Sequence, residues 1–229
     1  MVSDTRSYHH GDLRSALVEA GLRLARDGGS QALGLRSVTR SVGVSPNAAY
    51  RHFADWQTLV LAVAVEAQDL LARAMRLRMD AMADDPAEPA EGAGPGEPVE
   101  GAEGAESVGP GERALRRLRG VGLGYIHFAL SEPGWFELAI LTLNDPDRAD
   151  AVADRVAPPY QLLLDALDEA VDTGALPARR RSDAEWVCWS AVHGFADLAT
   201  RGPLRRQDRE TVDRLAEHVV NTVIEDLRR

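Results

Sequence analysis

The apolar residues of this chain recur at the spacing of α-helices. An early stripe steps by three and four residues and stops before Gly28; its members are Leu13, Leu17, Ala20 and Leu24. A similar stripe lies near the carboxyl end, at Val212, Leu215, Val219 and Val223. Such spacing places each set on one face of a helix. No stretch shows sustained period-2 alternation rich in Val, Ile, Thr and aromatic residues, so we predict an all-α fold.

This pattern divides the chain into four blocks. Residues 1–54 contain three short helical patterns and form a predicted helix-turn-helix domain, and residues 55–83 form one long connecting helix. Residues 84–112 are rich in Pro, Gly, Ala and Glu, with nine acidic residues and no basic one. They offer little apolar surface for burial, so we predict a disordered acidic insertion there. Residues 113–229 return to helical periodicity and form a predicted C-terminal domain for ligand binding and dimerisation.

The composition is that of an ordinary globular protein, with 45% hydrophobic and 27% charged residues. No apolar run approaches the roughly 20 residues of a membrane helix. The polar amino terminus lacks the apolar core of a secretory signal. Cys188 is the only cysteine, which excludes an intrachain disulfide and a multi-cysteine metal site. We therefore expect a cytoplasmic protein with no membrane association, no metal and no cofactor.

The net charge of −10 is unevenly distributed. Residues 1–56 carry seven arginines against five acidic residues, a balance of +2, so the remainder carries −12. The local field governs the approach of a phosphate backbone, and the basic excess lies in one segment. All 26 basic residues are arginine, whose guanidinium group suits phosphate geometry.

The most specific local pattern runs over residues 35–53, LRSVTRSVGVSPNAAYRHF. Gly43 separates two short amphipathic segments, where a tight turn needs a residue that tolerates positive φ. Ser45 has the side chain of an N-cap, and Pro46 follows at the first helical position. The predicted small core consists of Val38, Val42, Val44, Ala49 and Phe53. The outer surface of a helix of about two turns, which fits a major groove, then carries Asn47, Ala48, Tyr50, Arg51 and His52.

At these residues the chain resembles the tetracycline-repressor (TetR) family of transcription regulators. The similarity consists of residues 8–14 (YHHGDLR), 43–45 (GVS) and 50–53 (YRHF). Residues 189–194 (WSAVHG), with 128–130 (FAL) and 132–136 (EPGWF), resemble the Trp/His-Gly subgroup of that family. Three positions depart from the family pattern. Gly34 replaces Ser or Thr, and Trp56 replaces Lys, both usual phosphate donors. Thr39 replaces the usual alanine at the close contact between the second and third helices.

The resemblance implies roles for single residues of the helix-turn-helix. Tyr50 and His52 would contact phosphates, while Ser45, Asn47 and Ala48 would face base edges or the adjoining backbone. An Asn amide can bond adenine N6 and N7, and an Ala methyl can touch the thymine methyl. The alternative is that the aromatic and basic side chains are ordinary core or solvated groups. The predicted DNA-binding residues are Arg36, Ser45, Pro46, Asn47, Ala48, Tyr50, Arg51 and His52.

Two C-terminal segments predict a homodimer. Residues 186–199 (WVCWSAVHGFADLA) are apolar nearly all round, and residues 207–227 have a single apolar stripe. Two such helices can pack against their copies across a two-fold axis, with Gly194 permitting close approach. Ser190, His193 and Asp197 are polar positions of the first segment. They cannot converge on one carbonyl from a single helix, so we predict no enzymatic activity.

Aromatic residues concentrate near Pro133 and Pro158, which break or kink helices, and such clusters between bundle helices suit a small-molecule site. The predicted ligand-binding residues are Tyr125, His127, Phe128, Trp135, Phe136, Tyr160, Trp189 and His193. For Trp189 and His193 we favour a packing role, with His193 as a buried, hydrogen-bonded histidine.

These patterns and the resemblance together predict a homodimeric repressor that binds a palindromic double-stranded DNA operator. A small-molecule effector would tilt the helix over residues 55–82 and release the DNA. The first alternative is a constitutive DNA-binding regulator with a closed C-terminal core. An enzyme is the second alternative.

Overall fold

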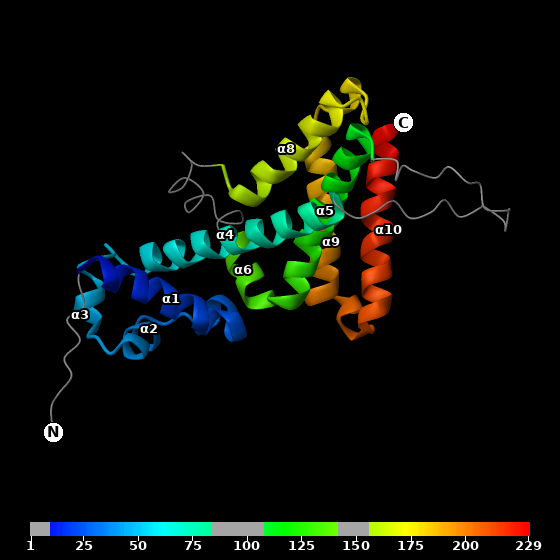
Figure 1. Ribbon diagram of the computed structural model, residues 1–229. Helices are drawn as coiled ribbons and strands as arrows, with labels where there is room; N and C mark the ends of the chain where they lie inside the picture. Colours follow the sequence, from blue (N-terminus) through cyan, green and yellow to red (C-terminus); the bar gives the residue numbers. More distant parts are fainter. Residues whose placement is uncertain (1–9, 84–107, 142–155) are drawn as a thin grey trace, which may run out of the picture.

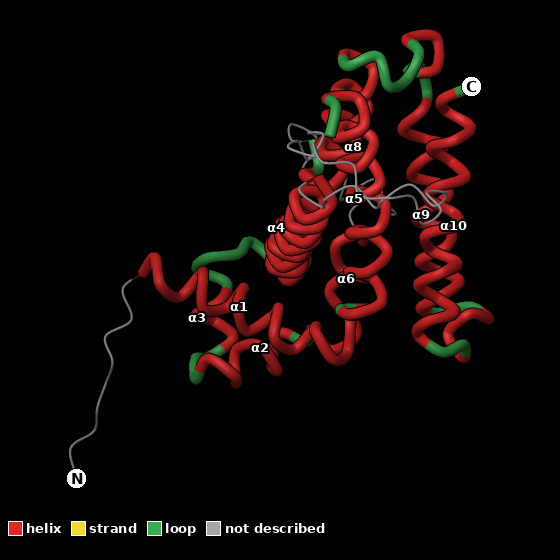
Figure 2. Tube along the Cα trace, turned by 45° about the vertical axis from the view of Figure 1, so that its right-hand side comes forward, coloured by secondary structure: helices red, strands yellow, loops and turns green. Residues whose placement is uncertain are grey.

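The computed structural model describes residues 10–83, 108–141 and 156–229, and side chains from residue 13 onward. Helices and short turns make up these residues, which contain no strand (Figure 2). The all-α prediction is confirmed. In chain order the elements are α1 (His10–Gly28), the 3₁₀ turn η1 (Gly29–Ala32), α2 (Leu35–Val42), α3 (Pro46–Ala49), α4 (Trp56–Ala83), α5 (Pro110–Ser131), α6 (Pro133–Leu141), α8 (Pro158–Asp172), η2 (Ala178–Arg180), α9 (Ala184–Thr200), η3 (Pro203–Arg206) and α10 (Arg209–Arg228).

The first three helices form a small bundle at one end of the molecule (Figure 1). Its centre is apolar and almost fully buried, as the sequence predicts; the buried members are Leu17, Val38, Ala49 and Phe53. Val42 and Val44 are half-buried at its edge. Thr39 is also buried, and its hydroxyl donates to the carbonyl of Leu35 at 2.8 Å, so the polar group in this core has an acceptor.

The long helix α4 connects the small bundle to the rest of the chain (Figure 1). Asp55 caps its first turn, because its carboxylate accepts from the backbone N–H of Thr58 at 2.7 Å. This bond lowers the pKa of Asp55. At the other end α4 crosses α5 at close range. A Cβ on Gly120 would lie 2.6 Å from Cα of Met79, and one on Gly124 would lie 2.8 Å from Cα of Met75.

Helices α5, α9 and α10 run side by side, with α8 packed against α5 (Figures 1 and 2). The face of α10 buried in this bundle is rotated from the predicted stripe. Val212 is buried as expected, but Leu215, Val219 and Val223 are only half-buried. The deeply buried positions that follow it are Ala216, Val220, Ile224 and Leu227. The difference arises because α10 packs against both α5 and α9. A stripe in the sequence does not show which side of the apolar face is buried most deeply.

The predicted acidic insertion, residues 84–112, ends earlier than expected. Helix α5 begins at Pro110, and a proline suits the first helical position because its missing N–H has no intrahelical partner there. Residues 110–112 therefore belong to the C-terminal helical part. Residues 84–107 lie outside the described residues, as do residues 1–9.

Candidate nucleic-acid interface and core cavity

The turn between α2 and α3 has the geometry that the sequence predicts. Gly43 adopts φ 78° and ψ 27°, a left-handed conformation that glycine tolerates without steric cost. Its N–H donates to the carbonyl of Arg40 at 3.1 Å. Ser45 is extended at the N-cap and Pro46 is the first helical residue. However, the side chain of Ser45 makes no capping hydrogen bond, so the predicted cap bond is wrong and this hydroxyl is available to another partner.

Helix α3 is shorter than the predicted two turns. Regular α-helix extends only from Pro46 to Ala49. The chain continues in tighter turns. The N–H of Arg51 donates to the carbonyl of Ala48 at 3.3 Å, and the N–H of His52 donates to the carbonyl of Ala49 at 2.9 Å. Phe53 then enters the core, where the guanidinium of Arg14 lies 5.2 Å from its ring centroid. The packing of Phe53 thus fixes the end of the segment relative to α1.

The predicted DNA-binding residues lie on α3, at its N-cap, in the turns that follow it and on the first turn of α2. Tyr50 is 50% exposed, which is unusual for an aromatic residue of this size. Asn47 and Arg51 are exposed, whereas Ala48 and His52 are half-buried. Arg36 is exposed on the first turn of α2. The arrangement offers amide, phenol and guanidinium donors to a polyanion.

A second group of predicted residues forms an aromatic cluster in the C-terminal part, in which Tyr125 and Phe136 are buried and Tyr160, Trp189 and His193 are half-buried. The ring of Tyr125 lies 5.2 Å from that of Phe136, at 85°, and 5.3 Å from that of Trp189. Tyr160 lies 5.7 Å from Trp189. The Tyr125 hydroxyl is 2.9 Å from Nδ1 of His193, a hydrogen-bond distance. These edge-to-face and tilted contacts are favourable arrangements for aromatic pairs.

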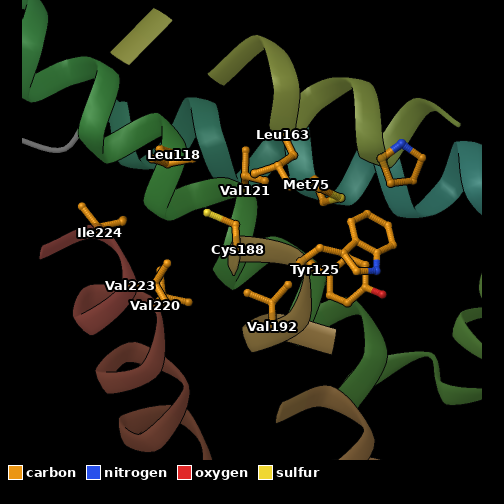
Figure 3. A pocket seen from close by; sticks show the side chains of 13 residues that line it. Met75, Leu118, Val121, Tyr125, Leu163, Cys188, Val192, Val220, Val223 and Ile224 are labelled. Atoms are coloured by element: carbon orange, nitrogen blue, oxygen red, sulfur yellow. The ribbon is translucent and has the colours of Figure 1, made fainter. Parts of the chain in front are cut away.

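This cluster borders a small apolar cavity of about 30 Å³ (Figure 3). Its walls come from α4, α5, α8, α9 and α10; the lining residues are Met75, Leu118, Val121, Gly122, Tyr125, Pro159, Leu163, Cys188, Trp189, Val192, Val220, Val223 and Ile224. Ligand sites for drug-sized molecules enclose about 300–1,000 Å³. The cavity in this conformation is therefore far too small for such a ligand.

Burial keeps the polar groups around the cavity neutral. It raises the pKa of the Tyr125 phenol well above its usual range and lowers the pKa of His193. With both groups uncharged, the phenol can donate to Nδ1 of a ring that carries its proton on Nε2. Burial also raises the pKa of Cys188 to about 11, which makes its sulfur a poor nucleophile.

Of the eight predicted ligand residues, Tyr125 and Trp189 line this cavity. Phe136, Tyr160 and His193 contact one of those two rings but do not line it. The remaining three lie away from it. Trp135 faces α1 instead, because its indole Nε1 donates to the carbonyl of Leu22 at 2.8 Å. His127 faces α10, with Nε2 3.5 Å from a carboxylate oxygen of Asp213. Phe128 is buried in the core and does not line the cavity. The prediction erred here because consecutive helical residues point in directions about 100° apart.

The cavity lining also includes residues that the sequence analysis missed. They are mainly aliphatic side chains such as Val121, Leu163 and Val192. In the sequence nothing distinguishes an aliphatic residue that lines a cavity from one that fills a core. Only the packing of five helices reveals the difference.

Helix α6 attaches the C-terminal part to α1. Besides the Trp135 bond, the guanidinium of Arg26 donates to the carboxylate of Glu132 through Nε at 2.8 Å and lies 4.9 Å from the Trp135 ring. The carboxylate of Glu137 accepts from the backbone N–H of Ser30 at 3.2 Å. In addition, the amide of Gln68 on α4, which is buried, donates to the carbonyl of Ala139. Helix α6 is thus bonded to both α1 and α4.

Neither a metal centre nor a membrane span is found in the described parts of the chain. Residues 10–83, 108–141 and 156–229 contain no group of three His, Cys, Asp or Glu side chains placed to hold a metal ion. No helix in these ranges has the length and apolar character needed to cross a bilayer.

Fold and site together define a helix-turn-helix transcription regulator that binds DNA. Two family models match the chain: one for bacterial regulatory proteins of the tetR family, over residues 17–63, and one for a tetracyclin repressor-like C-terminal domain, over residues 118–223. The chain belongs to the TetR family and is a regulator rather than an enzyme. The second match spans Trp189, His193 and Gly194.

Several solved structures share the fold. A protein of unknown function from Rhodococcus sp. RHA1 is 24% identical, with a TM-score of 0.71 over 98% of this chain and 100% of the other. A TetR family transcription regulator from Marinobacter aquaeolei VT8 is 16% identical, with a TM-score of 0.54 over 92% and 94%. A tetR family regulatory protein from Rhodococcus RHA1 is 14% identical, with a TM-score of 0.55 over 93% and 96%. No curated protein was found to match the sequence.

Proposed function

We propose that this regulator is a cytoplasmic homodimeric repressor that a small apolar effector releases from a palindromic operator. In each subunit α3 enters the major groove, where Asn47 and Ala48 contact base edges. Tyr50, His52 and the arginines position the helix on the phosphates. Two such segments about 34 Å apart would bind successive turns of one duplex. The proposed DNA contacts are Arg36, Ser45, Pro46, Asn47, Ala48, Tyr50, Arg51 and His52.

An uncovered apolar face on α9 supports the dimer. Val187 is 51% exposed and Leu198 is 44% exposed, and Gly194 lies between them on the same face. A Cβ built on Gly194 meets no atom within 4 Å, so packing within the described chain does not require a glycine there. Close approach of a second copy of α9 would use that space and cover both exposed side chains.

One observation carries the proposed release mechanism: adjacent residues of α6 contact the cavity cluster and the DNA-binding part. Phe136 packs edge-on against Tyr125, while Trp135 is hydrogen bonded to α1. A ligand that enters the cavity must displace part of its wall, since the present volume is about 30 Å³. Displacement of Tyr125 would move Phe136 and, with it, the neighbouring Trp135. The position of α1 relative to α6 would then change. Met75 also lines the cavity, so the tilt of α4 is a parallel route.

The experiment is an electrophoretic mobility shift with the DNA upstream of the protein's own gene, with and without a set of small apolar molecules. We expect one compound to weaken the complex. By linkage, the DNA must weaken binding of that compound by the same factor. Equal compound affinity for free and DNA-bound protein would refute ligand release. It would leave the DNA-binding assignment intact.

A second candidate function is a constitutive regulator with a closed core, as favoured by the small size of the cavity. The aromatic cluster and the Tyr125–His193 pair would then serve packing and helix registry. This candidate predicts that no compound enters the core cavity and that operator affinity is independent of every compound tested. The same mobility-shift and binding assays separate it from the effector-released repressor.

A further inference from the structure

A large groove lined by charged residues lies between the carboxyl end of α4, the first turns of α5 and the last turns of α10. Its volume is about 750 Å³, within the range of small-molecule sites. Four arginines line it, from all three helices: Arg78, Arg116, Arg119 and Arg228. Arginines from separate helices that face one groove repel one another unless acidic groups or a bound anion compensate their charge.

Protein carboxylates compensate this charge only in part. Glu112 pairs with Arg116 at 3.1 Å within α5. Glu217 lies 3.7 Å from a terminal nitrogen of Arg119, too far for a hydrogen bond. Glu225 also lines the groove.

Two of these arginines have a buried donor with no acceptor in the described chain. The Nε atoms of Arg78 and Arg119 are shielded from solvent, and no described residue accepts a hydrogen bond from either one. Buried donors in proteins are almost always paired, yet no described carboxylate is engaged at this edge of either guanidinium group. Because the Nε atoms are shielded, an anion in the groove would be held by the terminal nitrogens of the two groups. A guanidinium group matches the oxygens of a carboxylate or a phosphate, and it forms its strongest hydrogen bonds with such anions.

From this geometry we propose that the groove binds a small organic anion whose carboxylate or phosphate is held by Arg78 and Arg119. Apolar side chains between the arginines, Met82, Leu115 and Ile224, would cover the body of the molecule. This site is separate from the cavity of the proposed effector, apart from Ile224, which contributes to both linings. It also requires no assumption about DNA, since no residue of α1, α2 or α3 lines it.

The test is calorimetric titration of the full chain with benzoate, phenyl phosphate and benzyl alcohol, which share one ring and differ in the polar group. We expect saturable binding of at least one anion and none of the alcohol. Arg78→Gln and Arg119→Gln should each weaken it about tenfold, since each removes a charged hydrogen-bond donor. Arg76→Gln is the matched control, because Arg76 is exposed on the same helix and does not line the groove; it should bind like the unaltered protein.

Benzoate and phenyl phosphate distinguish a carboxylate site from a phosphate site. The proposal is overturned if neither anion saturates the protein, or if Arg76→Gln weakens binding as much as the groove variants. It is also overturned if inorganic phosphate alone binds the groove variants and the unaltered chain equally, because that result indicates an adventitious ion only. Circular dichroism of each variant shows whether it is folded. Should Arg78→Gln unfold, Arg228→Gln at the outer end of the groove replaces it, with an expected weakening of the same sign.

Discussion

The indole Nε1 of Trp135 donates a hydrogen bond to the backbone carbonyl of Leu22 across 2.8 Å, and this bond joins α6 to α1. The neighbouring Phe136 contacts Tyr125 at the border of the core cavity. Two consecutive side chains therefore lie between the C-terminal core and the DNA-binding part. This juxtaposition makes α6 a connection through which a change at the cavity can reach the DNA-binding helices.

Replacement of Trp135 by Phe should weaken this connection while retaining an aromatic ring. The variant loses the bond to Leu22 and leaves a carbonyl without its donor, so we expect it to be less stable by about 1 kcal/mol. Urea denaturation measures the difference. Trp186→Phe is the control, since Trp186 is 58% exposed and should change stability little. Equal effects of the two substitutions would contradict a special role for the Trp135 bond.

Gly134 tests the close approach of α6 to α1. A Cβ at this position would lie 2.1 Å from the carbonyl oxygen of Ala25 and 2.4 Å from that of Arg26. Backbone atoms cannot move aside as a flexible side chain can, so Gly134→Ala should destabilise the protein by more than about 2 kcal/mol. The midpoint of thermal unfolding should fall accordingly. A variant of unchanged stability would show that α6 is not held against α1 in this way.

Gly194→Ala separates dimerisation from folding. No described atom lies within 4 Å of a Cβ there, so the folded subunit should accept the methyl group, and helix propensity favours alanine over glycine by about 1 kcal/mol. If two copies of α9 meet at this position, the methyl group will obstruct them. We therefore expect a higher dimer dissociation constant in analytical ultracentrifugation, with retained helicity. Leu198→Arg should have a larger effect, and dimers of undiminished stability in both variants would place the interface elsewhere.

Stability should depend on pH through the histidines of the C-terminal part. Burial lowers the pKa of His193 and of His127 below the ordinary value of 6.5. The unfolded chain thus binds more protons than the folded protein in this range. Stability is complete above about pH 6.5 and declines as the pH falls below it. Urea denaturation at pH 7.5 and pH 5.5 measures the decline, and His193→Gln combined with His127→Gln should reduce it. A decline that persists in the double variant would assign it to other groups.

The sequence predicts the local features of this protein better than its long-range ones. Gly43 lies in the turn and Pro46 at the start of a helix, as predicted. Both features depend on backbone preferences of residues that are neighbours along the chain. The core of the small bundle follows from spacing alone. By contrast, Trp135 and His127 lie away from the cavity, because each contacts a helix that is far away in sequence. Composition alone could not show that the aromatic cluster borders so small a cavity, whose wall is mainly aliphatic.

Specific contacts by α3 can be tested by substitution of one donor at a time. Tyr50→Phe removes a single hydroxyl from a side chain that is 50% exposed. If that hydroxyl contacts a phosphate, affinity should fall by about 1 kcal/mol, roughly fivefold, for every duplex alike. Fluorescence anisotropy with a cognate and a scrambled duplex measures both affinities. His218→Ala, an exposed change on α10, is the control. A loss confined to one sequence would assign Tyr50 to base recognition instead.

The most direct measurement is selection of bound duplexes from a random pool, followed by anisotropy titration of the selected site with the unaltered protein and with Asn47→Ala. The account predicts a palindromic site with half-site centres about one helical turn apart. It also predicts that Asn47→Ala lowers affinity for this site by about 1–3 kcal/mol while affinity for random DNA changes little. Selection of no symmetric site would contradict the claim that two copies of α3 bind one duplex together. Equal affinity of both proteins for the selected duplex would also contradict the account.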